Sequence, residues 1–237
     1  MHYFFANQID RKTAQLDADE SLHLSKVLRL KIGDTVGVLD GSGVIYEAEV
    51  SSVHAKASLV EIRGIHRETP VRPYRLHIAI APTKMMERFE WFLEKAVEIG
   101  IDEISPILTE RCERDVVKMP RMENVVKAAM KQSLNAKTPV MNEPIQFAAF
   151  LKRTKAQASF IAHCAEGSKE LLPKVAMNER DVLVCIGPEG DFTLKEISLA
   201  LESGFKAISL GDSRLRAETA GVVACAQVQT ASLISKY

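Results

Sequence analysis

In Val182-Leu183-Val184-Cys185-Ile186-Gly187-Pro188-Glu189-Gly190-Asp191-Phe192, an apolar run leads into a loop that contains two glycines. A short apolar run bounded by turn residues is typical of a buried strand. Directly after the loop, Thr193 and Glu196 have the spacing of a capping box, which indicates the start of a helix. The stretch therefore predicts a strand, a tight loop and a helix, the unit from which parallel α/β sheets are built.

A second stretch repeats this pattern nearer the C-terminus, where the candidate strand Ala207–Leu210 precedes Gly211 and a helix follows Glu218. Ligands of parallel α/β sheets bind beyond the carboxyl ends of the strands, and glycine lets the backbone approach a ligand closely. One such loop alone is equally well an ordinary strand-to-helix turn. Two of them can place backbone groups beside one small ligand.

The rest of the chain divides into two patterns. Residues 1–70 are β-rich, with a hairpin over Val36–Leu39 and Val44–Val50, a strand over Lys56–Ile62 and a short helix over Asp19–Leu28, which favours a small barrel. Prolines make 69–73 an extended linker. Beyond it, strands and helices alternate, which predicts an α/β domain over 74–237 with a mainly parallel sheet. The further candidate strands are Tyr74–Ala81, Glu103–Leu108, Ser159–Cys164 and Val182–Ile186.

Apolar stripes at helical spacing begin at Met85 and at Met122, and Gly100 is placed to end the first of these helices. The helix after Glu218 carries small, uncharged side chains for many residues, so it is expected to pack inside the fold or against a second copy of the chain.

Composition excludes a uniformly basic nucleic-acid-binding protein, because the 237 residues contain 31 Lys+Arg and 31 Asp+Glu. Between Thr109 and Lys137, however, basic residues outnumber acidic ones by seven to four. A second, smaller basic cluster surrounds His23. Each cluster alone is typical of a solvated face, whereas two clusters on two domains that flank a ligand site suit phosphate contacts.

Other site classes lack support. Gly41-Ser42-Gly43 precedes a strand rather than a helix, so a nicotinamide-binding fingerprint is not indicated. The four cysteines form no CxxC pair, and we expect buried free thiols in a reducing compartment. His163 could line the site, but metal catalysis is not expected. With no signal peptide or membrane span in the sequence, a cytoplasmic protein is predicted.

Several motifs together resemble the RsmE family of 16S rRNA (uracil-N3-)-methyltransferases, of the SPOUT superfamily. The resemblance spans nearly the whole chain and is strongest in the two C-terminal loops. The chain departs from the family pattern at Asp191, where a second glycine is usual, near Arg214, where an isoleucine is usual, and near Asn135, where an arginine is usual. The other matching segments are His23–Arg29, Glu94–Gly100, Thr109–Arg114 and Gln132-Ser133.

The resemblance implies a PUA-like β-barrel followed by a SPOUT domain with a trefoil-knotted parallel sheet. It implies an S-adenosyl-L-methionine-dependent enzyme that methylates N3 of a uridine in 16S rRNA of the small ribosomal subunit. It also implies a homodimer, paired through the helix after Glu218. From the residues themselves, no membrane or metal partner is expected. The alternatives are a SPOUT methyltransferase that acts on another RNA or a ribose 2′-oxygen, and a non-catalytic RNA-binding module of ribosome assembly.

The resemblance also assigns site residues. Arg216 is the candidate for catalysis, through electrostatic stabilisation of the uracil anion. The candidate cofactor-binding residues are Gly187, Pro188, Glu189, Gly190, Leu210, Gly211, Leu215, Glu218, Thr219 and Ala220. The candidate RNA-binding residues are His23, Lys26, Arg29, Lys31, Arg111, Arg114, Lys131 and Gln132. No residue stands out as the general base, and Glu189 and Glu218 could equally cap or orient a loop.

Overall fold

The structure is a computed structural model that describes residues 1–10, 12–154 and 156–235. The chain folds into two compact units. The first contains Met1–Val71 together with Lys127–Thr138, and the second contains Arg72–Val126 and Pro139–Tyr237. In the described part of the chain, no helix has both the length and the apolar character needed to cross a bilayer.

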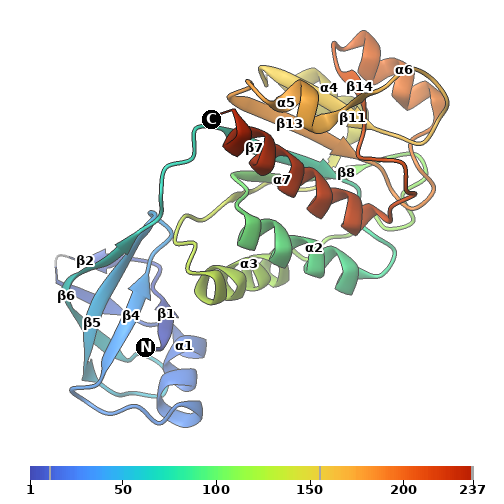
Figure 1. The fold of residues 1–237 in the computed structure, drawn as a ribbon. Coiled ribbons are helices and arrows are strands. Elements are labelled where there is room, and N and C mark those ends of the chain that lie inside the picture. The colour runs from blue at the N-terminus through green and yellow to red at the C-terminus, as the bar shows by residue number, and fades with distance from the viewer. Residues whose placement is uncertain (11, 155, 236–237) are drawn as a thin grey trace. The chain divides into compact units, whose positions relative to one another are not determined.

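The first unit is a curled sheet around an apolar core (Figure 1). Its strand order is β1-β4-β5-β6-β3-β2, with β1 parallel to β4 and the remaining pairs antiparallel. The predicted hairpin is confirmed as β4 and β5. The strand expected from Lys56 begins later, because the Ser58 side chain closes a turn with the backbone of His54. The strands are β1 Tyr3–Phe5, β2 Ile9–Asp10, β3 Thr13–Gln15, β4 Thr35–Leu39, β5 Val44–Ser52 and β6 Leu59–Glu68.

The helix predicted near residue 19 changes character along its length. It begins as α1 (Ala18–Leu22), where the Asp17 carboxylate accepts a hydrogen bond from the Glu20 amide at 2.9 Å. It continues as the π-helix η1 (His23–Val27), because the amide of Leu28 donates to the carbonyl of His23. Arg29 then ends it in a left-handed conformation, with φ of 56°.

A later segment of the chain completes the first unit. The amide of Ala136 donates to Thr69 Oγ1 at 2.9 Å, and the amide of Thr138 donates to the carbonyl of Gly41 at 3.1 Å. Gly41 has φ of 88°, and a Cβ atom there would overlap the Thr138 hydroxyl. Glycine is therefore required where these two segments meet.

The second unit is built on a parallel sheet with strand order β10-β8-β7-β13-β11-β14-β12, and β9 also pairs with β8. All five strands expected after the linker are present, each within two residues of its predicted bounds. The strands are β7 Arg75–Ile80, β8 Glu103–Leu108, β9 Val140–Met141, β10 Ile145–Gln146, β11 Ala158–Ala162, β12 Glu170–Leu171, β13 Asp181–Ile186 and β14 Lys206–Ser209.

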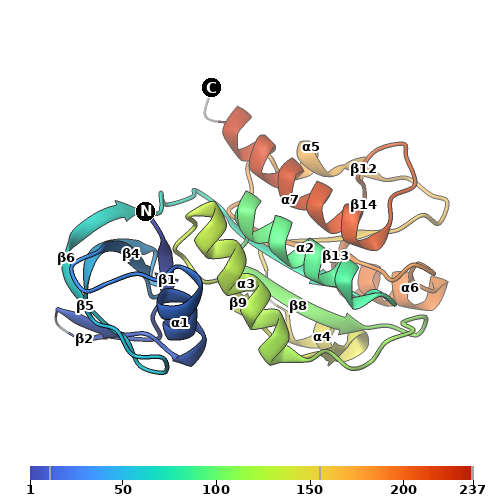
Figure 2. The same cartoon turned by 90° about the horizontal axis from the view of Figure 1, so that it is seen from below.

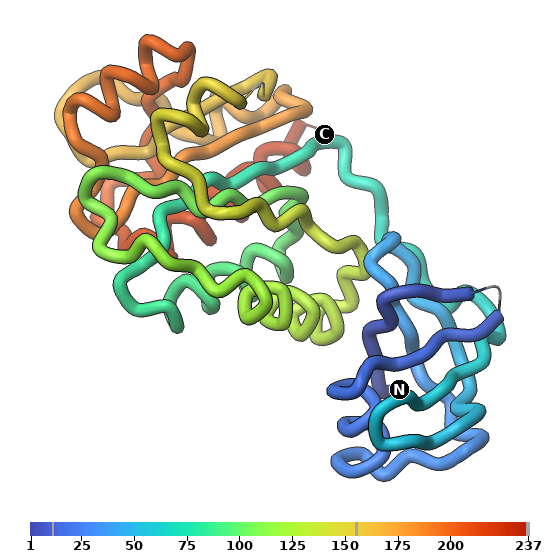
Figure 3. Tube along the Cα trace, turned by 180° about the vertical axis from the view of Figure 1, so that it is seen from behind, coloured from blue at the N-terminus to red at the C-terminus, as the bar shows by residue number. Residues whose placement is uncertain are grey.

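Helices cover both faces of this sheet. On one face α2 and α7 lie side by side (Figures 1 and 2), so close that a Cβ atom on Gly221 would meet the Phe92 ring at 2.6 Å. The other face is covered by α4 and α6, and Figure 3 views the chain from that side. The helices after the linker are α2 Met86–Ile99, α3 Met119–Ser133, α4 Phe147–Arg153, α5 Leu172–Ala176, α6 Leu194–Glu202 and α7 Ala217–Ile234.

The register of the central strands brings several loops to one edge of the sheet. Ile186 at the end of β13 pairs with Ile80 of β7 and with Ala162 of β11, and Ala162 pairs in turn with Ile208 of β14. The four strands therefore end together, and the loops that leave them begin at the same carboxyl edge.

Candidate functional site

A pocket of about 830 Å³ opens at this carboxyl edge. A volume of this size lies within the range of small-molecule and cofactor sites. Both glycine loops contribute to its wall, together with the end of β11 and the first turn of α2. It is lined by Arg88, Ala162, His163, Cys164, Lys169, Ile186, Gly187, Pro188, Glu189, Asp191, Ile208, Ser209, Leu210, Gly211, Asp212, Ser213, Arg214, Leu215, Arg216, Ala217 and Ala220.

The first loop is held at several points along its length. The amide of Asp191 donates to the Pro188 carbonyl at 2.9 Å, which closes a turn. The Glu189 carboxylate accepts from the Lys84 amide at 3.0 Å, so the loop is tied to the segment that precedes α2. At its end, the predicted capping box of α6 is confirmed, with Thr193 and Glu196 in reciprocal contact. The loop is therefore a fixed wall of the pocket.

Asp191 occupies a backbone conformation that favours glycine. Its φ is 62°, in the left-handed region. Its carboxylate accepts hydrogen bonds from the amides of Cys164 and Phe192, each at 2.8 Å. At the position where the resembled family usually has glycine, these two bonds hold the loop in the left-handed conformation.

Gly187 needs to be small for a different reason. A Cβ atom there would lie 3.0 Å from the Phe192 ring and 3.2 Å from the Phe192 amide nitrogen, so the loop turns tightly over its own next residues. At Gly190 a Cβ atom would meet only the Arg111 side chain, at 3.5 Å, which is ordinary contact.

The second loop turns at Gly211, whose φ of 131° favours glycine. The Ser209 hydroxyl accepts from the Gly211 amide at 3.1 Å and donates to its carbonyl at 3.0 Å. Gln227 of α7 donates to the Leu210 carbonyl at 2.9 Å. The loop then ends at Arg216, the N-cap residue of α7, whose exposed side chain also lines the pocket.

Most residues expected to bind the cofactor line this pocket. They are Gly187, Pro188, Glu189, Leu210, Gly211, Leu215 and Ala220. Gly190, Glu218 and Thr219 are not among the lining residues. Glu218 is buried behind the pocket, in the first turn of α7.

Sequence reasoning missed Arg88. It lies in the first turn of α2 and lines the pocket, and its Nε atom is 3.9 Å from Glu218 Oε1. Helical periodicity indicates only that Arg88 lies outside the apolar stripe of its helix. No local pattern connects it with a glutamate 130 positions further along the chain.

His163 lies where the sequence suggested, at the end of β11 and in the pocket wall. Burial and, secondarily, the nearby Lys169 ammonium lower the pKa of its imidazole below the usual value of 6.5. The ring is therefore neutral near pH 7. Its Nδ1 atom is buried without a hydrogen-bond partner among the described residues.

The candidate RNA-binding residues fall on both units. Lys131 and Gln132, although they follow the linker in sequence, belong to the first unit. Lys131 forms an ion pair there with the buried Glu20 carboxylate. Among the candidates in the first unit, the exposed side chains are those of His23, Lys26, Arg29, Lys31 and Gln132. In the second unit, Arg111 donates to the Gly190 carbonyl at 2.8 Å and Arg114 to the Lys84 carbonyl at 3.2 Å.

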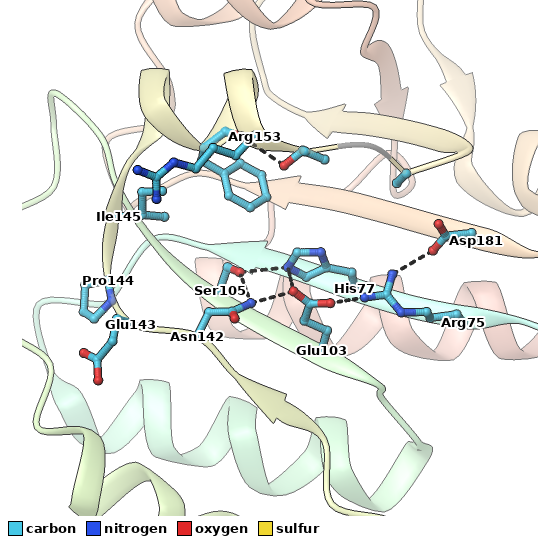
Figure 4. A pocket seen from close by; sticks show the side chains of 13 residues that line it. Arg75, His77, Glu103, Ser105, Asn142, Glu143, Pro144, Ile145, Arg153 and Asp181 are labelled. Carbon is cyan, nitrogen blue, oxygen red and sulfur yellow. Dashed lines mark hydrogen bonds and ion pairs between the residues drawn. The ribbon is translucent and has the colours of Figure 1, made fainter.

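A second pocket, of about 550 Å³, lies at the opposite, amino edge of the sheet (Figure 4). Six of its polar side chains are linked to one another by hydrogen bonds and ion pairs. Ser105 Oγ lies 2.9 Å from His77 Nε2 and 2.8 Å from Asn142 Nδ2, and Asn142 also donates to Glu103 at 2.6 Å. Arg75 pairs with Glu103 and with Asp181. Because these groups satisfy one another, we assign them a structural role.

The cysteines correct one expectation. All four are free thiols. Cys185 and Cys225 are buried, and burial raises the pKa of the Cys225 thiol to about 12. Cys164 is exposed and Cys112 is half-buried, so the prediction of buried thiols is wrong for Cys164. Its strand ends at Ala162, and Cys164 belongs to the loop that follows.

Comparison with known families gives two matches along the chain. Residues 70–229 match an RNA methyltransferase domain, and residues 16–63 match an RNA methyltransferase PUA domain. Ribosomal RNA small subunit methyltransferase E from Synechocystis is 31% identical over 228 residues, which cover 93% of this chain and 74% of that protein. The protein of the same name from Rickettsia conorii is 28% identical and covers 96% and 93%.

Solved structures show the same fold over nearly the full length. A probable rRNA methyltransferase from Porphyromonas gingivalis is 39% identical, with a TM-score of 0.87 and 99% coverage of both chains. A ribosomal RNA small subunit methyltransferase E from Neisseria gonorrhoeae, bound to S-adenosyl methionine, is 26% identical, with a TM-score of 0.87 and 97% coverage of both. A methyltransferase from Legionella pneumophila, also with bound cofactor, is 28% identical, with a TM-score of 0.88 and 97% coverage of both.

Proposed function

Since this chain belongs to the ribosomal RNA small subunit methyltransferase E family, we propose that it transfers a methyl group from S-adenosylmethionine to N3 of a uridine in 16S rRNA. The observation that carries the proposal is the pocket of about 830 Å³ in which both glycine loops meet. An RNA methyltransferase needs a small-molecule site for the methyl donor, and ligands of parallel sheets bind at this edge.

The pocket residues fit the methyl donor. Ile186, Ile208, Leu210 and Leu215 supply apolar side chains beside the polar loop backbone, a combination that suits an adenosine. At Gly211 nothing lies within 4 Å of the place that a Cβ atom would take, so the backbone there is open to close approach by a ligand. Relatives with the cofactor bound share this fold over nearly the whole chain. We therefore assign the pocket-lining residues of the two loops to cofactor binding.

When bound, S-adenosylmethionine supplies a methyl group to the N3 lone pair, while the carbon–sulfur bond breaks and its electrons stay on sulfur. The chain must hold the uracil in line with that bond and favour loss of the N3 proton. Positioning alone contributes several kcal/mol. The target base also has to leave its stack to enter the pocket. Arg216, at the pocket wall, is placed to stabilise negative charge on the uracil.

RNA binding is assigned to the exposed basic residues of the first unit, together with Arg111 and Arg114. Arg29 supports this assignment, because an arginine with φ of 56° is held in a conformation that glycine adopts at lower cost. Residues in strained backbone conformations are often found at functional sites.

Further properties are proposed on the family relationship. The second unit forms the trefoil knot of SPOUT proteins, and the enzyme acts as a homodimer paired through α7. Val222, Val223 and Ala226 of that helix remain half-buried in a single chain, which suits contact with a second copy. Because its substrate is ribosomal RNA, the enzyme works in the cytoplasm.

The decisive experiment is nucleoside mass spectrometry of 16S rRNA from cells with and without the protein. We expect N3-methyluridine to disappear without it and to return on complementation. An unchanged profile for N3-methyluridine with a loss of 2′-O-methylation would favour a different SPOUT reaction. An unchanged profile for every modified nucleoside would favour a non-catalytic role in ribosome assembly.

A further inference from the structure

Arg88 and Glu218 form a charged pair to which the reaction described above gives no role. Arg88 lies in the first turn of α2 and lines the cofactor pocket. Glu218 lies in the first turn of α7, with a side chain only 8% exposed. The two helices pack side by side, and Arg88 Nε lies 3.9 Å from Glu218 Oε1.

The Glu218 carboxylate is buried with unused hydrogen-bonding capacity. Its Oε2 atom has no partner among the described residues. A buried carboxylate is costly unless a cation or hydrogen-bond donors compensate it. The N-terminus of α7 offers a partial positive charge, and Arg88 offers a full one. A guanidinium has several donors in a fixed plane, so it can contact this carboxylate and a ligand at the same time.

Arg88 comes from a wall of the pocket that is separate from the two glycine loops. The segment that precedes its helix is tied to the first glycine loop, because the Lys84 amide donates to the Glu189 carboxylate at 3.0 Å. The loops present backbone groups and the exposed Arg216 side chain to the pocket, whereas this wall presents a cation that is paired with a buried carboxylate. Arg216, by contrast, is exposed, and no ion pair is found for it among the described residues. Arg88 is therefore the better-positioned of these two cations.

We propose that Glu218 holds the Arg88 guanidinium in the pocket and that Arg88 donates a hydrogen bond to a carbonyl oxygen of the target uracil. This inference rests on the proposed methyltransferase function. It makes Arg88 a catalytic residue and Glu218 a positioning residue that acts through it.

The chemistry explains why a cation is useful there. Loss of the N3 proton to solvent leaves a negative charge shared by N3 and the two carbonyl oxygens of uracil. A guanidinium beside one of these oxygens stabilises the anion and so lowers the pKa of the N3–H group. The N3 lone pair then forms the new bond to the methyl carbon as the carbon–sulfur bond breaks. A donor that is already in place stabilises this charge without reorganisation during the reaction.

The first test is Arg88→Gln, assayed with 16S rRNA substrate and saturating cofactor. We expect single-turnover methylation to fall by about 100-fold or more, as when one preorganised donor is removed from an anion site. The pH at which the methylation rate rises should also be higher in the variant, because without the cation the pKa of the uracil N3–H group is no longer lowered. Cofactor affinity, measured by calorimetry without RNA, should stay within about threefold. Arg88→Lys should recover part of the rate, since it keeps the charge but not the planar donors.

The second test separates positioning from general structure. Glu218→Gln should lower the rate less than Arg88→Gln does, and the double variant should match Arg88→Gln alone, because Glu218 acts only through Arg88. Thermal unfolding of the wild type, the two single variants and the double variant forms a double-mutant cycle. The stability losses of the two single variants should not add up to that of the double variant, which would show, independently of activity, that the two side chains interact. Arg180→Gln is the matched control, an exposed arginine at the amino edge of the same sheet.

The outcomes are distinguishable. If the wild type makes N3-methyluridine and Arg88→Gln does so at the same rate with the same pH profile, the inference is wrong and the proposed function stands. If Arg88→Gln loses cofactor affinity instead, Arg88 belongs to the cofactor site and the role on uracil is wrong. If the wild type itself makes no N3-methyluridine, the proposed function fails.

Discussion

Asp191 adopts a φ of 62° at the turn of the first glycine loop, where its carboxylate accepts from the amides of Cys164 and Phe192. Glycine reaches this conformation without strain, because it has no Cβ atom. Aspartate is among the few other residues that tolerate it, through local hydrogen bonds of its short side chain. The loop geometry at one position can therefore be kept by two different physical means.

This gives a prediction for substitutions at Asp191. Asp191→Ala loses both hydrogen bonds and keeps the strain, so we expect it to lower the free energy of unfolding by about 2 kcal/mol. Asp191→Gly loses the same bonds but relieves the strain, so its cost should be about 1 kcal/mol. Denaturant unfolding measures both. Equal losses for alanine and glycine would show that the left-handed backbone carries no strain.

Arg29 is the complementary case, in which a side chain persists at a position that favours glycine. With φ of 56° it ends the π-helix of the first unit. We expect Arg29→Gly to raise the free energy of unfolding by about 0.5–1 kcal/mol and to weaken binding of a 16S rRNA fragment. Chemical unfolding and fluorescence anisotropy check the two effects. Stabilisation with unchanged RNA affinity would argue against Arg29 as an RNA contact.

Among the elements, the strands of the parallel sheet separate two kinds of polar chemistry. At the carboxyl edge, polar groups of the loops line an open pocket. At the amino edge, the polar groups of β7 and β8 satisfy one another (Figure 4). Burial is the main reason that the pKa of His77 is lowered to about 4, with the Glu103 carboxylate acting in the opposite direction.

The amino-edge network predicts a pH dependence of stability. His77 is neutral when folded at pH 7, and Asn142 donates to Ser105 Oγ, so the Ser105 hydroxyl is free to donate to His77 Nε2. Unfolding returns the imidazole to a pKa of about 6.5, so the unfolded chain takes up the proton more readily. The contribution of neutral His77 to the free energy of unfolding is therefore complete above pH 6.5. It decreases as the pH falls from about 6.5 towards 4, by about 3 kcal/mol in total.

The measurement is chemical unfolding of wild type and His77→Gln between pH 4 and 8. Gln keeps an acceptor for the Ser105 hydroxyl but does not titrate. The variant should be less stable at pH 8 and show a shallower decline on acidification. If wild type and variant declined in parallel, His77 would not be the group responsible.

At the element level the sequence was informative where local patterns suffice. A strand is predicted by the apolar run 182–186, a helix end by Gly100 and a helix start by the capping box of Thr193 and Glu196. Each of these depends only on interactions between residues that are close in sequence. The π-helix is different, since no local pattern of residues predicts it; its buried residue, Leu24, belongs to the core of the first unit.

The candidate site divides along the same line. The two glycine loops are visible in the sequence, because turns constrain residue type locally. The Arg88–Glu218 pair, like the return of Lys127–Thr138 to the first unit, depends on contacts between distant parts of the chain. Residue propensities and the spacing of residues in the sequence do not predict such contacts.

At the scale of the whole molecule, a net charge of zero coexists with a local concentration of positive charge. Lys26 and Lys31 are exposed around the π-helix of the first unit, while the complete chain balances 31 basic against 31 acidic residues. The long-range field of a neutral molecule steers RNA weakly, so affinity must come from counterions released at local phosphate contacts.

The salt dependence of RNA binding therefore tests where the contacts lie. Each lost phosphate contact lowers the slope of log K against log salt by about 0.7–0.9, so Lys26→Gln with Lys31→Gln should reduce it by about 1.5. The control is Lys195→Gln with Lys206→Gln, two exposed lysines of the second unit that change the net charge equally. Anisotropy titrations of a 16S rRNA fragment over a range of salt concentrations give both slopes. If both double variants reduced the slope equally, total charge rather than the cluster on the first unit would govern binding.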